Sequence, residues 1–228
     1  MAVSPGSMTS LGRVWALLSV VAAAACSVGY LLPFWLLGEQ MGSEVSFGTF
    51  KRCSYPALVP GADGRLRVAM MNQCGRYSSW AAVPSPAWRG AAVAGALGSA
   101  LAVAGAVPLA LGCCLRPLAS GATPRIASAL HFTAGVLLGG ACASYPLGWG
   151  ALEVKQACGG TSDRFEPGAC RLGWSFYCAC AGAGLALLVG ACLPTCSRCG
   201  GAGSPAPRDR PQGARDRVLT RPSPLTPP

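Results

Sequence analysis

The sequence predicts a mainly α-helical membrane protein, in which four transmembrane helices carry a small folded cap. The first observation is composition. Of the 228 residues, 52% are hydrophobic and only 11% are charged, whereas a soluble domain carries about 25% charged residues. The second is that every Asp, Glu, Lys and Arg lies outside four stretches, 14–37, 90–115, 126–148 and 172–193. Each stretch exceeds the ~20 residues that a helix needs to cross a bilayer core of ~30 Å.

The third observation is the polar segment 43–88, which is far longer than the ~4–6 residues of an ordinary connection. It contains two runs of strand-forming residues, 45–55 and 65–77, joined by a turn region rich in proline and glycine. Each run carries one cysteine, Cys53 and Cys74. A small folded cap therefore fits this segment better than an exposed connector. Because two strands alone are marginally stable, further strands are expected from the second loop or from the flanks of this one.

The cysteines predict the orientation of the chain in the membrane. Four crossings place both termini on one side and the two larger loops, 38–89 and 149–171, on the other. Lys and Arg do not choose between the orientations, because nine lie on each side. Each larger loop, however, holds one pair of cysteines, as expected of disulfides formed in an oxidising compartment. These pairs are Cys53 with Cys74 and Cys158 with Cys170. The loops are therefore expected outside the cell.

Both termini are accordingly expected in the cytoplasm, in a multi-pass protein that reaches the plasma membrane by the secretory pathway. The cytoplasmic segments are 1–13, 116–125 and 194–228. The last is rich in Gly, Pro, Ser and Arg, shows no periodicity, and is predicted to be disordered. A cleaved signal peptide is the alternative for the first apolar stretch. Its length exceeds the ~7–15 residues of a signal's apolar region, which favours an uncleaved helix.

Residues within the apolar stretches predict where the helices end and how they pack. Aromatic residues cluster in 30–35 and 145–149, where interfacial rings prefer to lie, and place the outer end of the first helix near Trp35. Pro33 and Pro108 are expected to kink their helices. Small residues four apart predict close packing within the bundle, with a homo-oligomer interface as the alternative. These pairs are Ala94 with Gly98, Gly135 with Gly139, and Ala186 with Gly190.

The basic residues of the cap admit two interpretations, a solvated face or a surface that recognises an acidic partner. They are Lys51, Arg52, Arg65, Arg67 and Arg76. Arg65 and Arg67 alternate with Leu66, Val68 and Met70, which predicts a strand with one face covered. The net charge of +10 does not indicate nucleic-acid binding, because the basic residues are scattered through loops and a tail, without an aromatic-rich basic domain.

No residue pattern predicts an enzyme, a cofactor or a resident metal. No paired carboxylates lie in or beside the predicted membrane spans, and nucleotide-binding glycine motifs are absent. His131, the only histidine, has no acidic partner in any predicted span, which favours a structural or interfacial role. Cys196 and Cys199 have the spacing of half a zinc site, but cysteines near the inner membrane surface are better explained as palmitoylation sites. These candidates are Cys113, Cys114, Cys192, Cys196 and Cys199.

Polar groups that could line a transport path are almost absent from the predicted helices. The expected function is therefore binding. The cap and the helix faces would contact another integral membrane protein, and the helix surfaces would contact membrane lipids.

Several motifs carry a family resemblance. Trp35, Cys53 and Cys74 resemble the claudin pattern, from which Thr49 and Phe50 depart. A more specific set of motifs lies at 46–56, 74–77, 145–149, 153–154, 158–159 and 170–174. These motifs resemble the lipoma HMGIC fusion partner-like (LHFPL) tetraspan family of the claudin-like superfamily, and most of all the subgroup of the lipoma HMGIC fusion partner itself.

The resemblance implies a claudin-like fold, in which a small extracellular antiparallel sheet from both loops sits on a left-handed four-helix bundle. It also implies a non-enzymatic function as an auxiliary or scaffolding subunit of a channel, receptor or adhesion protein. Claudin-like cell–cell adhesion or membrane organisation is the alternative.

Overall fold

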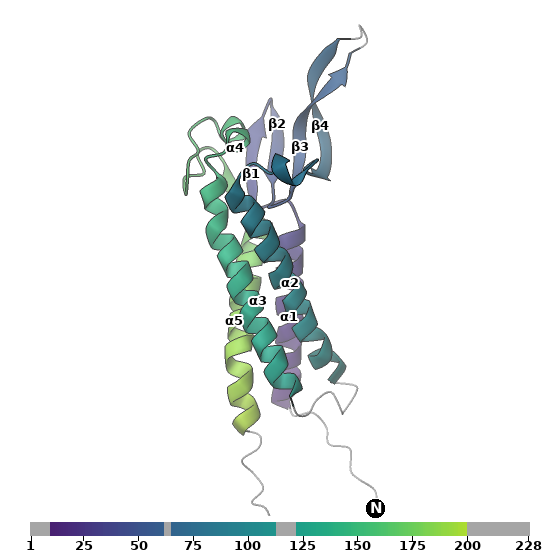
Figure 1. Ribbon diagram of the computed structural model, residues 1–228, viewed down its shortest axis with the longest axis vertical. Helices are drawn as coiled ribbons and strands as arrows, with labels where there is room; N and C mark the ends of the chain where they lie inside the picture. Colours follow the sequence, from purple (N-terminus) through teal and green to yellow (C-terminus); the bar gives the residue numbers. More distant parts are fainter. Residues whose placement is uncertain (1–9, 62–64, 113–121, 200–228) are drawn as a thin grey trace, which may run out of the picture.

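Four long helices lie side by side and carry a small sheet at one end (Figure 1). The computed structural model describes residues 10–61, 65–112 and 122–199, with side chains up to Cys192. The helices are α1 (Ser10–Leu31), α2 (Pro86–Gly112), α3 (Thr123–Ser144) and α5 (Trp174–Cys199). All four are long and apolar enough to cross a membrane. The predicted fold class is confirmed: a mainly helical tetraspan membrane protein with a small antiparallel sheet.

Shorter elements connect the helices at the cap end. A 3-10 turn, η1 (Trp80–Ala82), precedes α2, and a second, η3 (Tyr145–Gly148), continues α3. The second loop contains the short helix α4 (Leu152–Ala157). At the opposite end, α5 continues to Cys199, so the prediction of disorder from residue 194 is wrong for 194–199. Residues 1–9, 113–121 and 200–228 lie outside the described residues, and so do the segments predicted there.

The first helix ends earlier than the apolar stretch 14–37 predicted. Its last residue is Leu31, and Leu36 already belongs to strand β1 (Leu36–Gln40). Pro33 is the cause, because proline lacks the N–H of an intrahelical hydrogen bond and disfavours the helical conformation of the residue before it. The expectation that Pro33 kinks the helix is therefore wrong, since it lies beyond the helix end. Pro108 does lie inside α2.

Side chains from the cap satisfy backbone carbonyls at the end of α1. The Gly29 carbonyl would normally accept from the residue four positions on, which is Pro33 and has no N–H. The indole Nε1 of Trp35 donates to it instead, at 2.7 Å. Lys51 Nζ donates to the Leu31 carbonyl at 3.1 Å, where a cation also interacts favourably with the helix dipole. The end of α1 and the cap therefore form one structural unit.

The sheet has five antiparallel strands in the order β4-β3-β2-β1-β5. The remaining strands are β2 (Ser43–Phe47), β3 (Lys51–Pro60), β4 (Leu66–Arg76) and β5 (Arg171–Leu172). The predicted strand 45–55 is in fact two strands, β2 and β3, separated at Gly48–Phe50. The expected additional strands are present: β1 comes from the flank of the first loop and β5 from the second.

A cluster of buried aromatic residues joins the sheet to the helices. Trp35, Trp88 and Tyr145 are fully buried, and the rings of Trp88 and Tyr145 stack at 4.7 Å. Trp88 Nε1 donates to the Tyr145 carbonyl at 2.9 Å, and the Tyr145 hydroxyl donates to the Phe47 carbonyl at 3.2 Å. The rings of Trp35, Tyr145 and Trp149 are buried under the cap, so they are not the lipid-facing aromatic belt that the sequence predicted.

Small residues bring the helices into close contact, as the sequence predicted. A Cβ atom added at Gly98 of α2 would lie 3.0 Å from the Ala134 carbonyl oxygen of α3. One added at Gly135 of α3 would lie 2.8 Å from the Ala183 carbonyl oxygen of α5. These glycines therefore serve packing within the chain, where lipid supplies no hydrophobic force between helices.

Candidate partner-binding surface

The β3–β4 hairpin projects far beyond the rest of the cap (Figure 1). Its strands pair antiparallel from Lys51 with Arg76 to Pro60 with Leu66. The register shifts between Cys53 and Tyr55, where Ser54 adopts a positive φ of 53°. A bulge of this kind bends a ribbon and increases its twist. Because β2 pairs with β3 only at Cys53 and Arg52, the outer part of the hairpin extends past the sheet.

One face of the hairpin tip is apolar and exposed. Leu58 pairs directly with Val68, and Leu66 lies two residues from Val68, so all three side chains share a face. The exposed fraction is 65% for Leu58, 67% for Leu66 and 54% for Val68. Nearer the sheet, Met70 packs against the core. The prediction of a covered face is therefore right at Met70 and wrong at Leu66 and Val68, because none of the other described strands reaches the tip. Exposed apolar patches outside the membrane are typical of interaction surfaces.

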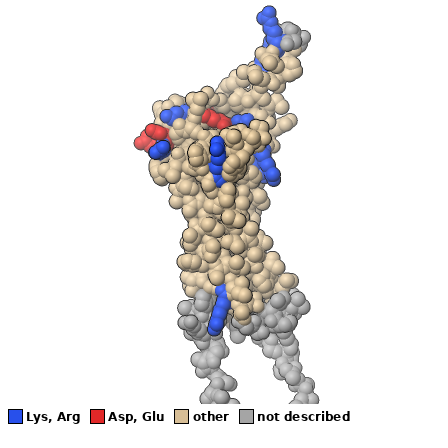
Figure 2. Space-filling model, viewed as in Figure 1, with Lys and Arg blue, Asp and Glu red and all other residues tan. Residues whose placement is uncertain are grey.

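The five basic residues predicted to bind a partner do not form one cluster. Arg65 and Arg67 are exposed at the hairpin tip, where basic side chains are visible in Figure 2. The other three lie at the base of the cap and make contacts within the protein. Lys51 donates to the end of α1, and Arg76 lies over the Phe50 ring at 5.9 Å. Arg52 forms an ion pair, described next.

Arg52 links the two loops of the cap through an ion pair with Glu153 of α4. Its guanidinium also lies over the rings of Tyr55, at 4.4 Å, and Tyr77, at 5.1 Å. Burial raises the pKa of the Tyr77 hydroxyl above its ordinary value; the nearby Glu153 carboxylate raises it further, and Arg52 opposes both. Arg52 is therefore engaged in holding the cap together. The sequence contained no local signal for this pair, because its members are 101 positions apart.

Two disulfides stabilise the cap. Cys53 is bonded to Cys74 between directly opposite residues of β3 and β4, and Cys158 is bonded to Cys170 within the second loop. Their sequence separations of 21 and 12 residues correspond to about 3 kcal/mol each in lost freedom of the unfolded chain. The first bond closes the hairpin at its base, and the second holds the loop that supplies β5.

The described residues contain no metal-binding cluster, and their only histidine is buried. No group of three or more His, Cys, Asp or Glu there could hold a metal ion. His131 is fully buried in α3, its Nδ1 lies 2.9 Å from the Ala127 carbonyl oxygen, and it packs against Gly105 of α2. Of the palmitoylation candidates, Cys192 lies near the end of α5 opposite the cap. Cys113 and Cys114 lie outside the described residues, as do the side chains of Cys196 and Cys199.

Comparison with known proteins identifies the family. The family model described as lipoma HMGIC fusion partner-like protein matches residues 11–197. LHFPL tetraspan subfamily member 2a protein of Danio rerio is 29% identical, covering 79% of this chain and 84% of its own length. Member 2 of Homo sapiens is 27% identical (77% and 82%), and member 3 of Danio rerio is 28% identical (76% and 75%).

The matched region contains all four long helices and both loops of the cap. The arrangement of those helices under a sheet built from both loops agrees with the tetraspan description of these relatives. The chain belongs to the lipoma HMGIC fusion partner-like family of tetraspan membrane proteins.

Proposed function

We propose that this protein is a non-enzymatic auxiliary or scaffolding subunit that binds another integral membrane protein through the tip of its β3–β4 hairpin. The channel, receptor or adhesion protein that it binds would lie beside it in the plasma membrane. Both termini would then be cytoplasmic and the cap extracellular. The two disulfides support this orientation, because such bonds persist in oxidising compartments.

The observation that carries the proposal is the uncovered apolar face of the hairpin. Leu58, Leu66 and Val68 are more than half exposed, at a distance from the helices where lipid cannot cover them (Figure 1). The ribbon is nevertheless held firmly at its base, by a disulfide and by the ion pair of Arg52. A rigid arm with an apolar face loses little conformational entropy on binding, which favours recognition of a partner. The adjacent Arg65 favours a partner surface that carries acidic residues near an apolar patch.

Proximity labelling in living cells tests the proposal. A labelling enzyme is fused to the C-terminus, and labelled proteins are compared between wild type and the variant L58S/L66S/V68S. We expect one integral membrane protein to dominate in the wild type and to be lost in the variant. Because these side chains are exposed and touch no core, surface expression should be unchanged.

The matched control is L152S, which removes an equally exposed leucine, 73% accessible, from α4 of the same cap. It should retain the partner. If the hairpin variant and the control label the same proteins at the same levels, the hairpin is not the binding surface. Recovery of no protein above background from wild type, by labelling and by cross-linking in mild detergent, would end the auxiliary-subunit proposal itself.

Cell–cell adhesion is the alternative, and one observation favours it. β4 is an 11-residue edge strand, and most of its residues are exposed, so its free backbone groups could pair with the same strand of a second copy. Cells that express the protein would then concentrate it where they touch each other. They would not do so where they touch cells that lack it, and this difference separates adhesion between copies from binding of a different partner.

A further inference from the structure

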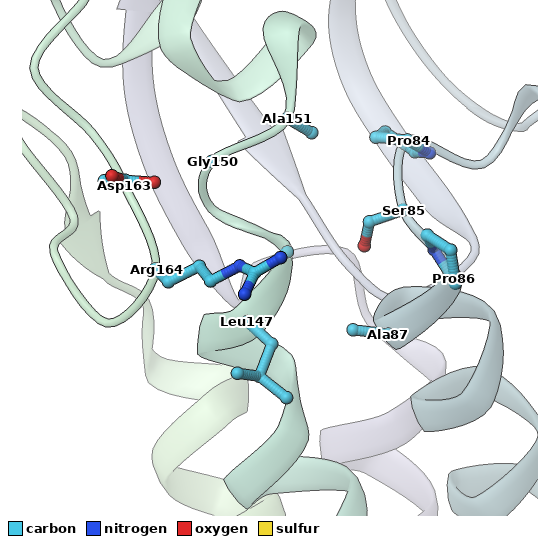
Figure 3. Close-up of a pocket in the computed structure, with 10 residues that line it drawn as sticks. Pro84, Ser85, Pro86, Ala87, Leu147, Gly150, Ala151, Asp163 and Arg164 are labelled. Atoms are coloured by element: carbon cyan, nitrogen blue, oxygen red, sulfur yellow. The ribbon is translucent and has the colours of Figure 1, made fainter.

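A pocket of about 550 Å³ lies where the cap meets the helices. Three segments line it: residues 84–87, which lead into α2; residues 147, 148, 150 and 151, which follow α3; and Asp163 with Arg164 from the second loop (Figure 3). Its volume lies within the range of small-molecule sites in proteins. Neither the buried aromatic cluster nor the hairpin tip contributes to it.

The pocket lies at the level where the membrane surface is expected. Below it, α2 and α3 expose apolar side chains along their lengths, among them Val93, Leu97 and Val136, and such faces contact lipid in a tetraspan protein. Leu147, in its wall, is 41% exposed, and Phe165, next to Arg164, is 61% exposed. An exposed phenylalanine and leucine at the rim of a polar pocket match the boundary between acyl chains and headgroups.

Two opposite charges in the pocket have no partner within the described part of the protein. The Arg164 guanidinium extends over Leu147 towards Ser85 (Figure 3). The Asp163 carboxylate lies beside Gly150, where an added Cβ atom would be 2.8 Å from its Oδ1. Neither side chain makes a hydrogen bond or an ion pair to another described residue. The Ser85 hydroxyl accepts from the Trp88 N–H at 3.1 Å, and its own O–H remains a donor.

The backbone fixes this part of the second loop. Asp163 and Glu166 exchange N–H···O bonds of 2.9 and 3.0 Å, and the Phe165 N–H donates to the Pro146 carbonyl at 3.2 Å. Phe165 has a φ of 63°, which a bulky side chain adopts at a cost of about 1–3 kcal/mol. The turn is therefore held against η3 in a conformation that an unconstrained loop would not adopt. Arg164 is placed beside the pocket by that turn.

We propose that this pocket binds the headgroup of a zwitterionic phospholipid in the leaflet on the cap side. Arg164 binds the phosphate, because a guanidinium matches two phosphate oxygens at once, and Ser85 donates to a third oxygen. Asp163 attracts the ammonium group of choline or ethanolamine. Leu147 and Phe165 contact the first methylene groups of the acyl chains. The lipid would fix the height of the cap above the membrane.

Native mass spectrometry of the full-length protein in detergent tests the site, with phosphatidylcholine titrated into the micelles. R164Q should weaken the first binding step about tenfold, the effect of losing one exposed charge-assisted contact. R65Q removes an exposed arginine from the hairpin tip and should bind as wild type. D163N should bind phosphatidylglycerol, which has no ammonium group, at least as well as phosphatidylcholine, whereas wild type prefers phosphatidylcholine. Equal melting temperatures establish that the variants are folded.

Three results would overturn the proposal. The first is equal binding of phosphatidylcholine by wild type and R164Q. The second is equal binding of diacylglycerol and phosphatidylcholine by wild type, which would mean that apolar contacts alone hold the lipid. The third is full displacement of the lipid by inorganic phosphate together with a phosphate affinity that depends on Arg164, which would identify a site for free phosphate. None of these results bears on the hairpin, so the two proposals fail independently.

Discussion

The end of α1 offers the sharpest test of how the cap and the bundle are joined. Trp35→Phe keeps an aromatic ring beside Tyr145, whose ring centroid lies 4.9 Å away, and removes only the indole donor. That donor is the partner of the Gly29 carbonyl, which Pro33 cannot satisfy. The substitution therefore leaves a buried carbonyl without a hydrogen bond at the last turn of a membrane-spanning helix.

The expected loss of stability follows from two terms. An unsatisfied buried carbonyl costs about 1–3 kcal/mol. The smaller ring also leaves a gap in a site with no exposure, which costs about 1 kcal/mol more. A total near 3 kcal/mol corresponds to a melting temperature roughly 6–12 °C lower for a chain of this size.

Thermal denaturation of the detergent-solubilised protein, followed by fluorescence-detected size exclusion, measures this difference. The matched control is Trp174→Phe, because Trp174 is 54% exposed, stacks on Phe34, and makes no indole hydrogen bond among the described residues. Its expected change is within about 0.5 kcal/mol. Equal shifts for the two variants would refute the conclusion that the indole replaces the missing N–H at Pro33.

Three further changes test the cap. Cys53→Ser or Cys74→Ser removes about 3 kcal/mol of stabilisation and leaves one unpaired thiol, so surface biotinylation should fall sharply; unchanged surface levels would contradict this. Arg52→Gln and Glu153→Gln should show a coupling of about 1 kcal/mol in a double-mutant cycle, because each side chain is about one-quarter exposed; strictly additive losses would mean that the pair contributes nothing. Tyr77→Phe removes a buried hydroxyl that has no hydrogen-bond partner among the described residues, so its melting temperature should equal or exceed that of wild type. The raised pKa of Tyr77 makes wild-type stability fall as the pH rises above about 10, where the unfolded tyrosine ionises, and a melting series against pH should show a smaller fall for the variant.

The main features of the fold were predictable because charge is excluded from lipid. The absence of Asp, Glu, Lys and Arg from four apolar stretches locates all four helices. The distribution of cysteines predicts one disulfide in each loop, as observed. Two strands alone are marginally stable, so the sequence predicted further strands, and β1 and β5 are those strands.

Features that depend on distant parts of the chain were not predictable. An aromatic residue at the end of an apolar stretch has the same local sequence whether lipid or a folded cap covers it, and Trp35 is covered by the cap. The ion pair between Arg52 and Glu153 has no sequence signature, since it depends on the folding of both loops. Periodicity at Leu66 and Val68 correctly predicted a strand, but it could not show whether any element covers that face.

The pairing of β1 with β5 sets the order in which the protein can be completed during synthesis. β1 lies directly after the first helix, whereas β5 lies directly before the last, and they pair at Leu36 with Leu172. Beside them the Gly173 N–H donates to the Trp35 carbonyl, and a Cβ atom at Gly173 would clash with the Phe34 carbonyl oxygen. A nascent chain that has emerged only as far as residue 170 therefore displays β1 as an open strand edge. That edge is covered only when the segment directly before the last helix pairs with it.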